Sequence, residues 1–295
     1  AKGPNAVLTM NGGSIHDNYM SNQFTSVVKI IEGASFVMNG GDISNNTLEH
    51  GGSNGLNAAV SVEGNRGSST MEMNGGTITG NSAEYGGILV GTFSTNYTLS
   101  NNFSNPAHYY STGTLKLNGG TISNNTAATL GGGIAINGTG KLIMEGGTIS
   151  GNKAPFGGGI GVNDYLTSSD RGTSSEAQWR SFFPAAATIN GGLITGNEAT
   201  MTAVTTQISD PNAENGVGGG LYVASKEVYV NGGQFTNNTA GKQGGGIYVA
   251  SIPYVLKMGK TLVTENTATK IGGGLWLCPT GSATTAVTNG ASFFD

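Results

Sequence analysis

Aromatic, arginine and aspartate residues gather in two segments of this 295-residue chain, 91–113 and 163–187. Together the segments hold nine of the 22 Trp, Tyr and Phe residues and two of the three arginines. Aromatic rings stack on the apolar faces of sugars, and charged groups hydrogen-bond their hydroxyl or acidic substituents. This grouping therefore favours carbohydrate binding. The candidate ligand-binding residues are Tyr109, Tyr110, Tyr165, Arg171, Trp179, Arg180 and Phe182.

Cleavage of a glycosidic bond would need two carboxylates, about 5–5.5 Å apart for retention or about 6.5–9.5 Å apart for inversion. Asp164 and Asp170 lie in one aromatic segment, and Asp210 lies in a further segment, 199–217. Their spacing in the sequence predicts no distance, so a catalytic role for these three aspartates stays open. The alternative is that the aromatic side chains only pack against the body of the protein.

Other chemistries have little support in the sequence. The three histidines are isolated and Cys278 is the single cysteine, so no metal-ligand spacing occurs and we expect neither a metal nor a cofactor. The net charge of −4 provides no basic surface for phosphates, which argues against a nucleic-acid partner. No apolar run reaches the length of a membrane-spanning helix.

The rest of the sequence, which must position these two segments, consists of a repeat. Its units start with Asn-Gly-Gly or a variant of it, at intervals that run from 27 residues (118 to 145) to 45 residues (145 to 190). An alternating apolar pair precedes the Asn-Gly-Gly element, and one apolar residue, a Gly-rich stretch and a second apolar pair follow it. A period of two predicts short strands with one buried face. The units begin at Asn11, Asn39, Asn74, Asn118, Glu145, Asn190, Asn231 and, in degenerate form, Gly259.

Three short strands per unit predict an all-β fold, a right-handed parallel β-helix of seven or eight coils. Glycine suits corners that need a positive φ or a close approach between coils. An asparagine also recurs three residues after each central apolar residue, as in Asn125 after Ile122. Asparagine tolerates the left-handed conformation, and stacked amides can form a ladder along the axis.

The pairing of Phe235-Thr-Asn-Asn238 with Gly244-Gly-Gly-Ile247 resembles the passenger repeats of polymorphic outer-membrane proteins. It is also similar to repeats in large bacterial surface proteins and in β-helical carbohydrate-active enzymes of the pectin-lyase-like type. The resemblance covers nearly the whole sequence. It implies a secreted or cell-surface location and adhesion or glycan contact, whereas the motif itself consists of corner and core residues.

We expect one β-helix domain over 1–295, a fragment of a longer protein, because the repeat stops in mid-pattern. Function should lie where the repeat is broken. Four insertions are predicted, at 57–70, 91–113, 163–187 and 199–217. The first three follow the same corner of successive coils.

Three functional readings follow. The first is an extracellular, adhesin-like module whose loops bind a glycan or a host surface. The second is a glycoside hydrolase or polysaccharide lyase with its cleft at 91–113 and 163–187. The third is an ice-binding solenoid, because Thr77/Thr79, Thr121/Ser123 and Thr148/Ser150 point outward beside inward isoleucines. That pattern breaks at His16, Asp42, Leu193 and Gln234. The oligomeric state is not predictable from these patterns.

Overall fold

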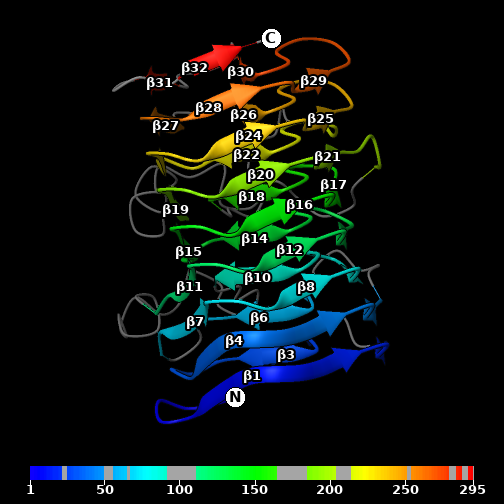
Figure 1. The fold of residues 1–295 in the computed structure, drawn as a ribbon, viewed down its shortest axis with the longest axis vertical. Coiled ribbons are helices and arrows are strands. Elements are labelled where there is room, and N and C mark those ends of the chain that lie inside the picture. The colour runs from blue at the N-terminus through cyan, green and yellow to red at the C-terminus, as the bar shows by residue number, and fades with distance from the viewer. Residues whose placement is uncertain are drawn as a thin grey trace, which may run out of the picture.

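In a computed structural model, the protein is an all-β stack of parallel strands with the N-terminus at one end and the C-terminus at the other (Figure 1). The structure describes residues 1–21, 25–49, 56–64, 67–91, 111–164, 185–203, 214–250 and 254–278, together with the backbone of 284–287 and 292–294. Three sheets run along the stack, one of sixteen strands and two of eight. This is the architecture of a parallel β-solenoid, as the short apolar segments predict.

The sixteen-stranded sheet has two limbs that meet at the long strand β4, on which β1 also pairs. The joining strands are β1 (Val7–His16) and β4 (Ser35–Ser44). The first limb contains β7 (Ser69–Met73), β11 (Gly113–Leu117), β15 (Lys141–Met144), β19 (Ala186–Ile189), β23 (Glu227–Val230), β27 (Val255–Met258) and β31 (Thr284–Val287). The second limb contains β8 (Thr77–Thr79), β12 (Thr121–Ser123), β16 (Thr148–Ser150), β20 (Leu193–Thr195), β24 (Gln234–Thr236), β28 (Leu262–Thr264) and β32 (Ser292–Phe294).

The two eight-stranded sheets complete the wall of the stack. One contains β2 (Tyr19–Met20), β5 (Thr47–Leu48), β9 (Ser82–Ala83), β13 (Thr126–Ala127), β17 (Lys153–Ala154), β21 (Glu198–Ala199), β25 (Thr239–Ala240) and β29 (Thr267–Ala268). The other contains β3 (Val28–Ile30), β6 (Val60–Val62), β10 (Ile88–Gly91), β14 (Ile134–Asn137), β18 (Ile160–Asn163), β22 (Leu221–Ala224), β26 (Ile247–Val249) and β30 (Leu275–Leu277).

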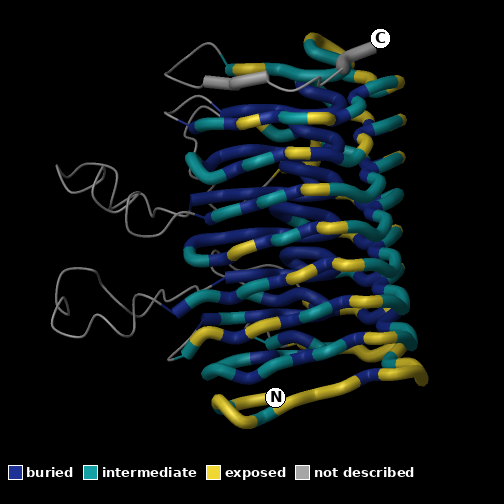
Figure 2. The backbone as a smooth tube through the Cα atoms, turned by 60° about the vertical axis from the view of Figure 1, so that its left-hand side comes forward, coloured by how far each residue is buried: buried dark blue, intermediate teal, exposed yellow. Residues whose placement is uncertain are grey.

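The core is a column of apolar side chains inside the stack. Figure 2 shows that buried residues recur in every turn of the backbone. In one turn Leu115 and Leu117 of β11, Ile122 of β12 and Ile134 of β14 are fully buried. Each of these residues contributes about 1.5–3 kcal/mol when its side chain leaves water. The register places equivalent residues directly above one another, as in Ile122 beside Ile149. The apolar period therefore specifies which face of each strand points inward.

The recurring asparagines form a ladder along the stack, as the sequence predicts, and the ladder is buried from Asn46 to Asn238. Asn125 donates its backbone N–H and its Nδ2–H to Asn152 Oδ1, each at 3.0 Å. Asn152 repeats this pattern toward Asn197. A second Nδ2 hydrogen reaches back to the neighbouring turn, from Asn152 to Ile122 O at 3.0 Å. The ladder consists of Asn18, Asn46, Asn81, Asn125, Asn152, Asn197, Asn238 and Asn266.

The left-handed residue at this corner is the one before each ladder asparagine, not the ladder asparagine itself. Asn45, Asn124 and Asn237 have φ of 53°, 55° and 56° and are exposed. Asp17, Gly80 and equivalent residues take the same conformation in other turns. Two adjacent residues thus have different roles at this corner. The first residue turns the backbone, and the second residue carries the buried hydrogen bonds.

Part of the predicted insertion 57–70 belongs to the stack. Val60–Val62 form β6, which pairs in parallel with β3 and β10. Its three residues are buried. This strand was not predicted from the sequence, because Ala58-Ala59 stands where later turns carry the Gly triplet.

In the described part of the protein there is no helix of the length and apolarity needed to cross a membrane.

Candidate functional site

The connections between the β10-containing sheet and the first limb leave the stack at one corner, here called the display corner. One short connection at this corner is 138–140, between β14 and β15. In the neighbouring turns, β10 joins β11 through 92–112 and β18 joins β19 through 164–185. Because the flanking strands are in register, all three connections start and end at equivalent positions.

The 92–112 connection leaves and returns at almost one point. A Cβ atom on Gly113 would lie 2.8 Å from Gly91 N and 2.0 Å from Val62 O. Gly91 has φ of 131°, a conformation that residues with a Cβ atom rarely adopt. Glycine is therefore required at both ends of this connection, since the strands that enter and leave it touch backbone to backbone.

Asp164 closes the base of the 164–185 connection. Its Oδ1 accepts a hydrogen bond from Ala185 N at 2.8 Å, and its own N–H donates to Ala224 O at 2.9 Å. The residue is 2% exposed. This burial and contact indicate a structural role for Asp164, while the catalytic role suggested by the sequence stays a prediction.

The segment 199–217 departs from another corner and is closed in a similar way. Asn215 donates from Nδ2 to Met201 O and Thr202 O, both at 2.8 Å. Thr200 N and Gly216 N bind the carbonyls of Ala154 and Pro155 in the preceding turn, again at 2.8 Å. Sequence reasoning missed Asn215. Its position was the available signal, because Asn215 is an amide that can donate and accept hydrogen bonds and it stands directly before the Gly-rich stretch at which the repeat resumes.

Most of the residues predicted to bind a ligand lie outside the described ranges. This holds for Tyr109, Tyr110, Tyr165, Arg171, Trp179, Arg180 and Phe182, and also for Asp170 and Asp210. Of the predicted site residues, the structure places Asp164 alone. Both segments that contain the predicted ligand-binding residues begin and end at the display corner.

A second surface, here called the hydroxyl face, lies on the outer side of the second limb and carries hydroxyl side chains that recur from strand to strand. It has two columns of residues. Column A contains Ser14, Asp42, Thr77, Thr121, Thr148, Leu193, Gln234 and Leu262. Column B contains His16, Ser44, Thr79, Ser123, Ser150, Thr195, Thr236 and Thr264.

The two columns of the hydroxyl face differ in regularity. The interruptions at Asp42, Leu193 and Gln234 all fall in column A. Column B keeps a hydroxyl in every strand from β4 to β28. Some of these hydroxyls bond to one another, as Thr79 does to Ser123 and Thr236 does to Thr195, both at 3.0 Å. Since a hydroxyl has one donor and two acceptor positions, such a pair keeps hydrogen-bonding capacity toward solvent.

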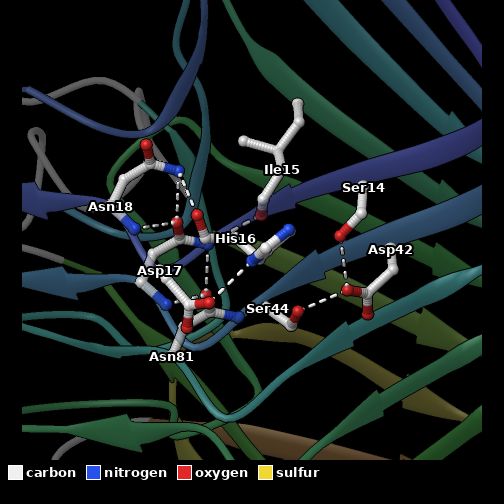
Figure 3. Close-up of polar contacts among 9 residues, drawn as sticks. Ser14, Ile15, His16, Asp17, Asn18, Asp42, Ser44 and Asn81 are labelled. Atoms are coloured by element: carbon white, nitrogen blue, oxygen red, sulfur yellow. Dashed lines mark hydrogen bonds and ion pairs between the residues drawn. The ribbon is translucent and has the colours of Figure 1, made fainter.

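Asp42 organises the N-terminal end of the hydroxyl face (Figure 3). Its carboxylate accepts hydrogen bonds from Ser14 at 3.0 Å, from Thr77 at 2.7 Å and from Ser44. Partial burial raises the pKa of this carboxyl, but the bonds from Ser44, Thr77 and Ser14 and the nearby His16 outweigh it, so the pKa lies below its ordinary value. Asp42 is thus an ionised acceptor, and the hydroxyls of Ser14, Ser44 and Thr77 donate their hydrogens to it.

His16 Nδ1 lies 2.7 Å from Asp17 Oδ2, and both side chains are largely exposed (Figure 3). An exposed polar contact of this kind contributes little to stability. Within the described ranges, no group of three His, Cys, Asp or Glu residues has the geometry to hold a metal ion. The described polar groups of His16 are hydrogen-bonded to Asp17 and Asn18.

Comparison with known proteins adds no assignment. No protein-family model matches the sequence, and neither the curated proteins nor the solved structures contain a match. The class of protein is accordingly defined by the architecture alone, an all-β stack with parallel solenoid-like sheets.

Proposed function

We propose that this protein is an extracellular, adhesin-like module of a bacterial surface, in which a right-handed β-helix of seven to eight coils displays loops that bind a glycan or a host-surface ligand. The resemblance of its repeats to polymorphic outer-membrane proteins supports the location. The observation that carries the proposal is the closed base of the two aromatic-rich connections, at Gly91/Gly113 and Asp164/Ala185. A loop held at its base by the scaffold presents its residues without interrupting the stack.

The register of the display corner supplies the test. Gly91 pairs with Asn137 and Asn137 with Asn163, while Lys141 pairs with Thr114 and Ala186. Residues 92–113 and 164–185 can therefore each be replaced by Gly-Thr-Gly, the native connection at 138–140. We expect the doubly replaced variant to keep its strand signal in circular dichroism and to lose binding on a glycan array. Loss occurs because all seven candidate contact residues are removed.

Shortening 204–213, which lies at a different corner, is the matched control and should leave binding unchanged. Binding that survives the double replacement would contradict the proposal. Cleavage of a bound glycan by the unmodified protein would instead favour the carbohydrate-active enzyme and direct attention to Asp170 and Asp210.

Column B favours ice binding as a second candidate function. Its hydroxyls repeat at the spacing of parallel strands, about 4.8 Å. From β8 to β28, columns A and B contain no charged residue. An uncharged surface with hydroxyls at regular intervals is suited to ordering a layer of water. The proposal concerns the hydroxyl face and is independent of the display corner.

Completing column A should strengthen any ice activity. We expect Leu193→Thr combined with Gln234→Thr to increase the freezing-point depression measured on a growing ice crystal, because column A would then be hydroxylated from Thr77 to the turn of Gln234. Thr148→Tyr should abolish it by breaking the flat surface. Thr188→Tyr is the control, since Thr188 faces outward on the other limb beside Tyr229. If the growing ice crystal keeps its ordinary shape and freezing point with the unmodified protein and with every variant, this function is excluded.

A further inference from the structure

Three turns of the stack carry the sequence Asn-Asn-Thr at the corner of the asparagine ladder. The segments are 45–47, 124–126 and 237–239. In each, the first asparagine has a left-handed backbone, the second belongs to the ladder, and the threonine begins a strand, β5, β13 or β25. The first asparagine and the threonine are exposed in all three segments. Asn-X-Thr is the acceptor signal for N-linked glycosylation.

The backbone of this corner does not require asparagine at the first position. The equivalent residues in the other turns have φ between 56° and 67° and are Asp17, Gly80, Gly151, Gly196 and Glu265. Two positions further on, those turns have Tyr19, Ser82, Lys153, Glu198 and Thr267. By contrast, each exposed asparagine is followed by a threonine at that position. The corner geometry thus accounts for a left-handed residue, but it does not account for the pairing of asparagine with threonine.

The two amides of each segment differ in their availability. The ladder amide is engaged, as Asn46 Nδ2 is with Asn81 Oδ1 at 2.8 Å. Within the described ranges, the side-chain amides of Asn45, Asn124 and Asn237 form no hydrogen bond, and the hydroxyls of the three threonines form none either. The first amide and the threonine hydroxyl of each segment are therefore open to recognition by an enzyme.

Glycine leaves space beside these asparagines in the neighbouring turns. A Cβ atom on Gly80 would lie 2.5 Å from Asn45 Oδ1, and one on Gly151 would lie 2.5 Å from Asn124 Oδ1. No two of the exposed asparagines lie in adjacent turns. At the spacing of parallel strands they are about 10 Å and about 14 Å apart, which leaves room for a separate sugar chain on each.

We infer that Asn45, Asn124 and Asn237 are acceptors for N-linked glycosylation, which would place a row of sugars along this corner. The donor is a sugar activated as a nucleotide- or lipid-linked diphosphate. Nδ2 of the asparagine attacks C1 of the sugar, the N–C1 bond forms as the bond from C1 to the diphosphate oxygen breaks, the diphosphate leaves with the electron pair, and Nδ2 releases a proton to a base of the transferase. This modification is independent of the display corner and goes beyond the proposed binding function.

Transfer must precede the closure of the corner. In the folded protein Asn46 N donates to Asn81 Oδ1 at 3.0 Å and Thr47 N donates to Asn18 O at 2.8 Å, so the segment cannot leave the stack to enter an enzyme. The fold then decides which modified positions it can accommodate. An exposed asparagine carries its sugar into solvent, whereas a buried one cannot.

Another described sequence of the same type, Asn137-Gly-Thr139, provides the internal comparison. Asn137 is 1% exposed, and its Oδ1 accepts from Asn163 Nδ2 at 3.1 Å. Thr139 Oγ1 donates to Ser111 O at 2.9 Å. A sugar on Asn137 would displace these contacts, so a chain modified there should not complete the stack.

The test is peptide mapping by mass spectrometry of the folded protein, isolated from the cells that naturally produce it. We expect Asn45, Asn124 and Asn237 to carry sugar and Asn137 to be unmodified. An amidase that removes N-linked glycans converts each occupied asparagine to aspartate, which marks the positions whatever the sugar is. The inference is overturned if the three exposed asparagines are unmodified, or if Asn137 is occupied as often as they are.

A pair of variants produced in the same cells tests the role of the threonine. Thr126→Val removes the hydroxyl and should abolish modification of Asn124, while Asn45 and Asn237 stay occupied. Thr126→Ser keeps the hydroxyl and should keep Asn124 modified. Both variants should retain the strand signal in circular dichroism, because the Thr126 side chain is exposed. Unchanged occupancy of Asn124 in Thr126→Val would contradict the inference.

Discussion

Replacing Asn152 with leucine should destabilise the stack by about 3–9 kcal/mol, since three buried polar groups are left without a partner and each costs about 1–3 kcal/mol. The groups are Asn125 N–H, one Asn125 Nδ2–H and the carbonyl of Ile122. Asn152 is fully buried, so water cannot replace the lost bonds. A loss of this size is a large fraction of the stability of an ordinary domain.

Urea unfolding monitored by circular dichroism measures this change. A transition in two steps would indicate that the turns on the two sides of Asn152 unfold separately, because stability in stacked repeats depends on nearest-neighbour contacts. Asn124→Gly is the matched control one residue away. Asn124 is exposed with φ of 55°, a conformation that glycine adopts readily, so its replacement should change stability by less than about 1 kcal/mol. A small effect at Asn152 would show that the ladder is dispensable.

The Gly158→Ala substitution should lower the free energy of unfolding by about 3–5 kcal/mol, at the upper end of the cost of overpacking. The new Cβ atom would lie 2.4 Å from Glu198 O, 2.5 Å from Glu198 C and 2.6 Å from Glu198 N. All three are backbone atoms of the next turn, so no rotamer change relieves the contact. The two turns would have to separate, and the hydrogen bond from Gly158 N to Gly218 O at 3.1 Å would be strained.

Gly12→Ala is the control for this effect, because the position of its Cβ is open. It should change the urea midpoint little, by less than about 0.5 kcal/mol in stability, as is usual for surface substitutions. Equal midpoints for the two variants would mean that the turns at Gly158 adjust without cost, contrary to the close packing of the corner.

Much of the scaffold was predictable because its period is short and local. The alternation of Leu115 and Leu117 and the single Ile122 identify strands and their inward faces, and all three residues are buried. The asparagine ladder was predictable for the same reason. Strand β6 was harder, because the apolar pair Val60 and Val62 lacks the Gly triplet that marks its equivalents. Asp164 was visible as a carboxylate beside aromatics, but not as the residue that closes a loop.

The all-β class, the parallel stacking and the identity of the core could be inferred from the sequence, since these depend on residue types and on a short local repeat. Tertiary structure decided that the residue before each ladder asparagine takes the left-handed conformation, because adjacent asparagines such as Asn124 and Asn125 are chemically identical. It also decided the roles of Asp164 and Asn215. Both roles depend on contacts between segments that are far apart in the sequence, and such contacts leave no period in it.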